Sequence, residues 1–326
     1  MQAFQLRDYT GPDGLSRVDV ELPLAAHGEI ILRVHAIGVN FPDLLMIKGQ
    51  YQHKPELPTI PGCEVAGTVI NAPAGSGWKS GDRAAAFVWQ GGYAEQVAVP
   101  LNSIVHVPDS VEFAAAAAMV VNYHTVLFAL SHRGAVKPGE TVLVMGAAGG
   151  IGTAAVQVAK GLGARVIAGV TDSGQAETAT VAGATETILL RPGFSNEIRK
   201  MTNDRGVNAV LDPLGDWLSG EAIRGLATEG RLLVIGFAAG QIPEIKLNRL
   251  LLRNVSVTGV AFGAFLVGDH QLIGRQAEAL DKMVASGTVA PHIGNRFRFD
   301  ELPTALHALD RGEVKGKAVV IVVPDP

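Results

Sequence analysis

Short apolar runs separated by turn residues dominate the first third of the chain. Apolar positions at Glu29–Val34, Glu64–Ile70 and Tyr93–Val99 predict β-strands. The turn signals between them are Gly28, Pro61-Gly62, Pro73, Gly81-Asp82 and Gly91-Gly92. Short strands at regular intervals are typical of a partly open barrel, and we expect one here.

The pattern changes near Phe113, where an Ala- and Leu-rich segment, Phe113–Leu130, predicts a helix. After it, strand Thr141–Met145, helix Ile151–Leu162 and strand Arg165–Val170 follow one another. Further strands are predicted at Thr187–Leu190, Asn208–Leu211, Arg231–Ile235 and Val255–Thr258, with a helix over Gln271–Ala285 and a final strand over Ala318–Val323. Alternating strands and helices predict parallel βαβ units in a doubly wound sheet.

Composition narrows the class of protein. The chain has 326 residues, 48% hydrophobic and 18% charged, which favours a globular α/β protein of about two domains over a disordered chain. With 27 basic and 31 acidic residues the net charge is −4, which argues against nucleic-acid binding. The longest apolar run, Phe113–Val121, is too short to cross a bilayer, and Met1–Thr10 lacks the apolar core of a signal peptide. We therefore expect no membrane association and a cytoplasmic location.

Cys63 is the one cysteine in the sequence. It excludes an internal disulfide framework and any zinc site built from several cysteines of one chain. A thiol beside one carboxylate, Glu64, does not make a zinc site either. We expect Cys63 to act as a small buried apolar residue, and we predict no metal site.

A glycine-rich turn follows strand Thr141–Met145 and opens the helix at Ile151. A pyrophosphate bound at a helix N-terminus needs bare backbone N–H groups, and Gly149 leaves room for that approach. Gly152 would allow close packing of helix on strand, whereas Ala147 replaces the first glycine of the usual pattern. The turn predicts a dinucleotide site; the alternative is a tight βα turn without a ligand.

Asp172 stands 20 residues after Gly152, at the spacing of an acidic residue that binds the adenosine ribose. Aspartate is also favoured at helix N-caps, so Asp172 has two interpretations that the sequence leaves open.

Further motifs lie outside the glycine-rich turn: Gly38-Val39-Asn40-Phe41-Pro42-Asp43, Gly49-Gln50-Tyr51, Pro61–Gly67, Gly81-Asp82-Arg83, Gly91–Glu95, Gln157–Lys160, Asp212–Gly215 and Gly236-Phe237-Ala238. With them, nearly the whole chain resembles the medium-chain dehydrogenase/reductase superfamily, and within it the zinc-independent quinone oxidoreductase (zeta-crystallin-like) branch. In zinc-dependent relatives a cysteine takes the place of Asn40 and a histidine that of Cys63.

The resemblance implies an α/β fold in which a GroES-like, partly open β-barrel catalytic domain is joined to a Rossmann doubly wound parallel sheet. The implied segments are 1–121 for the catalytic domain, 122–262 for the Rossmann domain and 263–326 for the return to the catalytic domain, with the nicotinamide in the cleft between domains. Val255–Thr258 would be a sheet edge, and such an edge implies a homodimer.

The implied activity is a zinc-free, NADPH-dependent transfer of hydride to a small molecule, a quinone or an activated alkene (enone). Hydrogen-bond donors can stabilise the charge that develops on a conjugated oxygen, and the resemblance makes Tyr51 and Asn40 the catalytic residues. The residues expected at the cofactor are Asn40, Thr125, Gly149, Gly150, Ile151, Gly152, Asp172, Gln175, Arg191, Phe237 and Phe262.

Several alternatives stay open. Tyr51 is also compatible with a wall residue, and Phe237 and Phe262 with core residues. Gln175 stands where NADP-using relatives often place a lysine, although Arg191 could compensate, so NADH remains an alternative to NADPH. The matching tyrosine donates a proton in related enoyl-thioester reductases, which makes that activity the second enzyme hypothesis. The hypothesis outside the enzymes is a nucleotide-binding protein without turnover that has a structural or RNA-binding role.

Overall fold

The computed structural model describes residues 1–323, and the chain divides into two compact units. The first unit comprises Met1–Val121, Asp269–Ala277 and the segment from Ile293 on; the second comprises Asn122–Gly268 and Glu278–His292. Both units thus share the predicted return segment 263–326, whose last three residues lie outside the described residues. The predicted domain boundaries remain a prediction.

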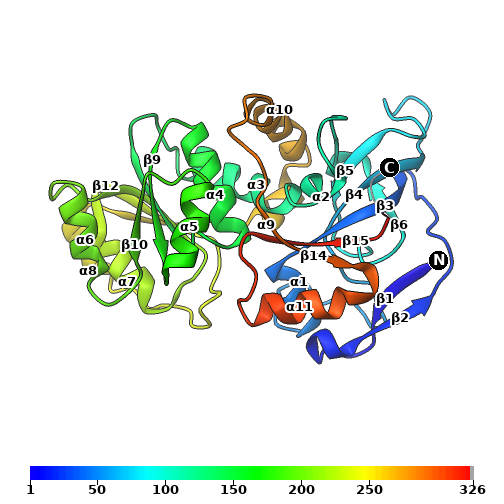
Figure 1. Cartoon of the computed structure of the whole chain (residues 1–326), viewed down its shortest axis with the longest axis horizontal. Coiled ribbons are helices and arrows are strands. Elements are labelled where there is room, and N and C mark those ends of the chain that lie inside the picture. Colours follow the sequence, from blue (N-terminus) through cyan, green and yellow to red (C-terminus); the bar gives the residue numbers. More distant parts are fainter. Residues whose placement is uncertain (324–326) are drawn as a thin grey trace. The chain divides into compact units, whose positions relative to one another are not determined.

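The first unit is built on a seven-stranded sheet in the order β14-β15-β3-β4-β5-β7, with β6 paired to β3 (Figure 1). All its pairings are antiparallel except that of β14 with β15. The strands are β3 (Glu29–Val39), β4 (Glu64–Asn71), β5 (Arg83–Phe87), β6 (Gln96–Pro100), β7 (Ile104–His106), β14 (Ile293–Arg298) and β15 (Lys317–Ile321), and a separate hairpin is formed by β1 (Gln2–Leu6) and β2 (Leu15–Asp19). This antiparallel-rich sheet agrees with the expected fold.

Strand β3 lies at the centre of this unit because it pairs with β4, β6 and β15. Its side chains Ile30, Leu32 and Val34 are fully buried in the apolar core. The helical segments of the unit are η1 (Gly11–Gly14), α1 (Phe41–Ile47), η2 (Leu101–Ser103), α2 (Phe113–Ala116), η4 (Phe299–Glu301) and α11 (Leu302–Asp310).

The second unit is built on a six-stranded parallel sheet in the order β10-β9-β8-β11-β12-β13. Its strands are β8 (Thr141–Met145), β9 (Arg165–Val170), β10 (Glu186–Leu189), β11 (Val207–Asp212), β12 (Leu226–Val234) and β13 (Ser256–Gly259). The chain winds outward from β8 in one direction and from β11 in the other, so the order reverses between these two strands. In doubly wound sheets, ligands bind at the carboxyl ends of the strands at such a point.

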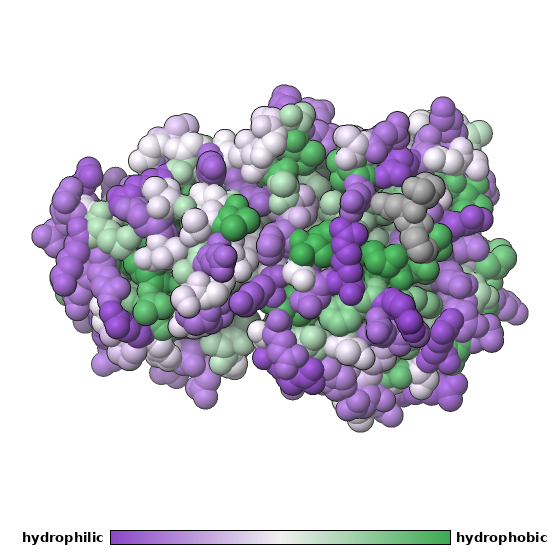
Figure 2. All heavy atoms as spheres, viewed as in Figure 1, coloured by the Kyte–Doolittle hydropathy of each residue, from purple (hydrophilic) through white to green (hydrophobic). Residues whose placement is uncertain are grey.

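The helices that connect these strands are α4 (Gly150–Gly161), α5 (Ser173–Val181), α6 (Phe194–Met201), α7 (Asp216–Gly225) and α8 (Leu247–Arg253). Before the sheet come α3 (Val120–Leu127) and the π-helical turn η3 (Phe128–Arg133), and after it come α9 (Phe262–Gly268) and α10 (Leu272–Ala285). No helix within residues 1–323 is long and apolar enough to cross a membrane. On the face in Figure 2, hydrophilic residues are interspersed among apolar ones.

Strands Thr141–Met145 and Arg165–Val170 confirm the predicted bounds, but the single helix predicted over Phe113–Leu130 is wrong. The chain leaves helix α2 after Ala116 and starts α3 at Val120. The N–H of Val121 donates to the Glu64 carboxylate at 2.7 Å, so a partner distant in sequence stabilises the start of α3. A local pattern of alanines cannot reveal such a partner.

Candidate active site

The glycine-rich turn between β8 and α4 contains two glycines with different roles. A Cβ on Gly152 would lie 2.1 Å from the Gly146 carbonyl oxygen, so only glycine fits there, as expected for close packing of helix on strand. A Cβ on Gly149 would have its nearest neighbour, the same oxygen, at 3.6 Å, and its φ of −83° suits any residue. The protein itself therefore does not require glycine at 149, and the space beside it is free for a ligand.

Gly149 is the N-cap of the twelve-residue helix α4, and its carbonyl accepts the Thr153 N–H at 2.8 Å. The first N–H groups of a helix have no partner within the helix, and the helix dipole adds positive potential there. Gly150 and Ile151, both partly exposed, occupy this first turn. The turn can hold a pyrophosphate on backbone N–H groups.

A second loop, Asp212–Gly215, packs on this turn from the carboxyl end of β11. The buried Asp212 carboxylate accepts the N–H groups of Leu214 at 2.9 Å and Gly215 at 2.8 Å, and it also accepts the Ser219 hydroxyl. Burial raises the pKa of Asp212, while these hydrogen bonds lower it. A Cβ on Gly146 would lie 3.2 Å from the Leu214 side chain, so the two loops are in contact where the strand order reverses.

Phe237 follows β12 and belongs to the same end of the sheet. A Cβ on Gly215 would lie 2.7 Å from its ring, and the Ala238 N–H donates to the Pro213 carbonyl at 3.0 Å. Phe237 is 36% exposed, so part of the ring is available to a ligand. The structure thus brings Phe237 together with the loops beside the glycine-rich turn.

Asp172 caps helix α5, because its side chain accepts the Gln175 N–H at 2.9 Å. This confirms the capping interpretation; its ribose contact stays a prediction. The Gln175 side chain accepts the Thr171 N–H at 3.1 Å. Arg191 forms an exposed ion pair with Glu197 at 2.7 Å, so binding a phosphate would require it to share or leave that partner.

Thr125 and Phe262 are largely buried, at 8% and 6% exposure. Phe262 packs in an aromatic cluster, with its ring centroid 6.0 Å from that of Phe128 and 6.3 Å from that of His124. This packing accounts for Phe262 as a core residue. The cofactor contacts predicted for Thr125 and Phe262 stay predictions.

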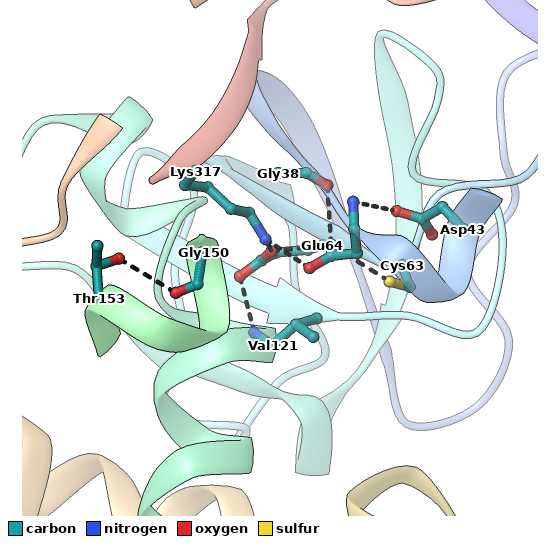
Figure 3. A network of polar contacts seen from close by, with 9 residues as sticks. Gly38, Asp43, Cys63, Glu64, Val121, Gly150, Thr153 and Lys317 are labelled. Atoms are coloured by element: carbon teal, nitrogen blue, oxygen red, sulfur yellow. Dashed lines mark hydrogen bonds and ion pairs between the residues drawn. The ribbon is translucent and has the colours of Figure 1, made fainter. Parts of the chain in front are cut away.

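In the first unit, Asn40 precedes α1 as its N-cap and belongs to a buried polar network. Figure 3 labels its partners Glu64, Cys63 and Lys317. The Lys317 ammonium donates to Glu64 Oε2 at 2.6 Å and also to Asn40 Oδ1. Asn40 Nδ2 donates to Glu64 Oε2 and to the Gly38 carbonyl, each at 3.0 Å, and lies 3.6 Å from the Cys63 sulfur. Both N–H bonds of the amide are therefore used within the protein. A catalytic role of Asn40 at the substrate stays a prediction.

Asp43 lies next to this network and is fully buried. Its Oδ2 accepts the Asn40 N–H at 3.0 Å. Burial raises the pKa of Asp43 to about 6, against the lowering effects of the Cys63 thiol, the Asn40 N–H, Lys317 and Tyr93. Asp43 is thus a carboxyl group that takes up a proton near pH 6.

Cys63 and Tyr51 respond to the same surroundings. Burial and the adjacent Asp43 carboxyl raise the pKa of the Cys63 thiol, so Cys63 is not a thiolate nucleophile. Tyr51 is half-buried, and burial raises its pKa, with smaller effects of Cys63 and Asp43. Like any tyrosine, Tyr51 carries its proton at neutral pH, and the raised pKa makes its hydroxyl a weaker acid than that of an exposed tyrosine.

We expect Asp43→Asn to stabilise the protein at alkaline pH. Folding raises the pKa of Asp43 from 3.8 to about 6, so the native state binds this proton more tightly than the unfolded chain does. Its contribution to the free energy of unfolding is greatest below the unfolded pKa and is lost as pH rises through the folded pKa. Above that range the variant should be more stable by about 3 kcal/mol, the equivalent of this pKa shift. Urea unfolding at several pH values measures this; a difference independent of pH would contradict it.

Comparisons with known proteins match both halves of the chain. The family described as "Alcohol dehydrogenase GroES-like domain" matches residues 26–109, and the family described as "Zinc-binding dehydrogenase" matches residues 150–280. The chain is 36% identical over 301 residues to "Quinone oxidoreductase-like protein 2" of Bos taurus, covering 91% of this chain and 86% of that protein.

Two solved structures are similar over nearly their whole length. A probable oxidoreductase from Mycobacterium abscessus is 45% identical with a TM-score of 0.91, covering 99% of each chain. The quinone oxidoreductase from Thermus thermophilus, solved also in complex with NADPH, is 34% identical with a TM-score of 0.83, covering 99% of this chain and 100% of that one.

The zinc in one matching family's description prompts a test of the residues around Asn40 and Cys63. They offer one thiol with a raised pKa, an amide, and the Glu64 carboxylate, which already binds the Lys317 ammonium. Zinc prefers deprotonated thiolates and neutral imidazoles, so this donor set does not fit it. Within residues 1–323, no group of three or more His, Cys, Asp or Glu side chains could hold a metal ion.

Sequence reasoning missed Glu64 and Lys317 as members of this site. One feature of the sequence could have indicated them. Glu64 is the first residue of β4 and Lys317 the first residue of β15, and in both strands apolar residues follow the charged one. Such a charge is buried at a cost unless it is paired.

Proposed function

We infer the function of this chain from its family: it belongs to the zinc-independent quinone oxidoreductase branch of the medium-chain dehydrogenase/reductase superfamily. We propose that it is an NADPH-dependent oxidoreductase that transfers hydride to quinones or activated alkenes. A cytoplasmic location is part of the same proposal.

The observation that carries the proposal is the glycine-rich turn at the point where the strand order reverses. Gly149 leaves open space before the first turn of α4, and the Asp212–Gly215 loop borders the turn. These features suit the pyrophosphate of a dinucleotide. The NADPH complex of the Thermus thermophilus relative supports NADPH as the dinucleotide.

NADPH, when bound, supplies the hydride. The chain's part is to orient the cofactor at Gly149–Gly152 and to protonate the reduced substrate. Tyr51 is our candidate for the second task, because it matches the proton-donating tyrosine of related reductases and its phenol, which is half-buried, carries a proton at neutral pH. Quinones and enones suit such a site because their negative charge develops on a conjugated oxygen that hydrogen bonds can stabilise.

Oxidation of NADPH and of NADH by the purified protein tests the proposal with panels of quinones, enones and enoyl thioesters. We expect turnover of quinones or enones with NADPH, and weaker turnover with NADH. Binding of NADPH without turnover of any acceptor would instead support a nucleotide-binding protein without enzymatic activity. No binding of either nucleotide would contradict the assignment of the glycine-rich turn.

Tyr51 also favours a second candidate function, the reduction of enoyl thioesters. A phenol that keeps its proton in a half-buried position suits protonation of an enolate. The enoyl-thioester arm of the same panel decides: a kcat/KM well above those for quinones and simple enones would make it the main activity.

We further propose a homodimer through the edge strand β13 of the second unit. β13 is the last strand in the sheet order, and its Val257 is 36% exposed. Leu247, Leu251 and Leu252 of the preceding helix α8 are each 76% exposed. An open strand edge with neighbouring exposed apolar side chains favours pairing with a second copy.

Sedimentation velocity at micromolar concentration tests the dimer. We expect a dimer that Val257→Asp and Leu251→Asp convert to monomer, because each places a charge on the proposed contact. Leu24→Asp is the matched control, since Leu24 is 91% exposed in the first unit. A monomeric wild-type protein, or equal effects of all three variants, would refute the proposed interface.

A further inference from the structure

Lys317 and Glu64 form a buried ion pair in the first unit. Their side chains are 5% and 0% exposed, and Nζ lies 2.6 Å from Oε2. Apolar residues of similar volume often replace a buried ion pair without loss of stability. The stability of the fold alone therefore does not explain why Lys317 carries an ammonium group here. The contacts of this ammonium indicate a further role.

The first contact determines how the Asn40 amide is oriented. The ammonium donates to Asn40 Oδ1, while Nδ2 donates to the Glu64 carboxylate and the Gly38 carbonyl. If the amide were flipped, its NH₂ group would face the ammonium and its oxygen would face two acceptors. Lys317 therefore permits only one of the two amide orientations.

The second contact acts through Glu64. Its Oε2 binds the ammonium and its Oε1 accepts the Val121 N–H at 2.7 Å (Figure 3). Val121 is the second residue of α3, where backbone N–H groups need an acceptor and the helix dipole favours negative charge. The same helix carries Thr125 one turn later. The ammonium thus fixes the carboxylate that holds the start of α3.

We propose that Lys317 is a positioning residue of the active site: its ammonium orients the Asn40 amide and, through Glu64, fixes the first turn of the helix that carries Thr125. The proposal rests on the proposed function, because Asn40 and Thr125 matter to turnover if they contact the nicotinamide.

The main test is Lys317→Met, which keeps most of the volume and removes the charge. We expect kcat for quinone reduction to fall at least about tenfold, since small displacements at a reacting centre have effects of this size or larger. The Kd of NADPH should change less than about threefold, because the glycine-rich turn that holds the pyrophosphate is unaltered. A role in folding alone would not separate kcat from Kd in this way.

Chemical rescue tests whether the ammonium itself matters. Lys317→Ala removes the part of the side chain beyond Cβ, namely three methylene groups and the ammonium group. Propylammonium matches this removed part in size and charge. We expect propylammonium to restore kcat of Lys317→Ala in a saturable manner, and 1-propanol not to. Lys317→Met, whose side chain fills the space, should not respond to either.

Lys48→Met is the matched control, because it removes an ammonium from the partly exposed Lys48–Asp310 pair of the same unit. It should change neither kcat nor the Kd of NADPH. A folded Lys317→Met with wild-type kcat would overturn the proposal. So would equal changes in kcat and Kd without rescue by propylammonium.

Amide hydrogen exchange of the protein without cofactor separates this inference from the proposed function. In Lys317→Met, we expect faster exchange at Val121 and the first turn of α3, with β3 and β4 protected as in the wild type. If the wild-type protein oxidises no NADPH, the proposed function fails, and this exchange result alone tests the positioning network. Unchanged exchange at Val121 would overturn the inference.

Discussion

Replacing Gly149 by valine is expected to lower the affinity for NADPH at least about a hundredfold, or about 2.7 kcal/mol. The added Cβ meets no protein atom closer than 3.6 Å, so the first carbon of the side chain fits without a clash. It would occupy the space in front of the first N–H groups of α4, where we place the pyrophosphate. Ligand binding should fail while the fold persists.

Titration of NADPH fluorescence measures the affinity, and thermal unfolding provides the control for folding. Gly149→Ala should show a smaller loss, because it adds one carbon. Gly152→Val should instead affect folding. Its Cβ would lie 2.1 Å from the Gly146 carbonyl oxygen, so this variant should destabilise the second unit. Wild-type affinity in Gly149→Val would mean that the turn has only a structural role.

Tyr51→Phe is expected to lower kcat for enones and enoyl thioesters about a hundredfold or more, the usual scale of general acid catalysis. The variant removes the hydroxyl that would donate the proton, and it retains the ring. Quinones should respond less, because their reduced oxygens are less basic than an enolate carbon and can take protons from water.

The two substrate classes serve as each other's control in this measurement, and the affinity for NADPH should stay at the wild-type value. A large loss confined to enones and enoyl thioesters would assign proton donation to Tyr51. A small and equal loss for both classes would make Tyr51 a wall residue, and it would remove the main support for the enoyl-thioester activity.

The parallel sheet was predictable because its central strands β8 and β11 are buried at all but one residue each. Val142, Leu143 and Val144 in β8 are fully buried, and their apolar run is visible without knowledge of the fold. Strand β14 was not predicted, because it lies at the edge of its sheet and carries Asn295, Arg296 and Arg298. An edge strand that exposes polar side chains, as β14 does, has a sequence similar to that of a loop.

The two parts of the candidate site differ in the same way. The glycine-rich turn is local, since one stretch of chain contains the strand end, the turn and the helix start. The network around Asn40 joins residues separated by 253 and 277 positions, Glu64–Lys317 and Asn40–Lys317. The pairing of β15 with β3 brings Lys317 to that place, and no local pattern encodes it.

The position of β15 in its sheet has a consequence for the order in which the protein is made. The second unit is complete in sequence at His292, whereas the sheet of the first unit lacks β14 and β15 until residues up to Ile321 have been synthesised. During translation, every residue of the parallel sheet and its glycine-rich turn is therefore available before Glu64 can meet Lys317. The sequence of the second unit, which contains the glycine-rich turn, is therefore fully synthesised before that of the first unit. The first unit begins at Met1, but its sheet can be completed only after β15 has been synthesised.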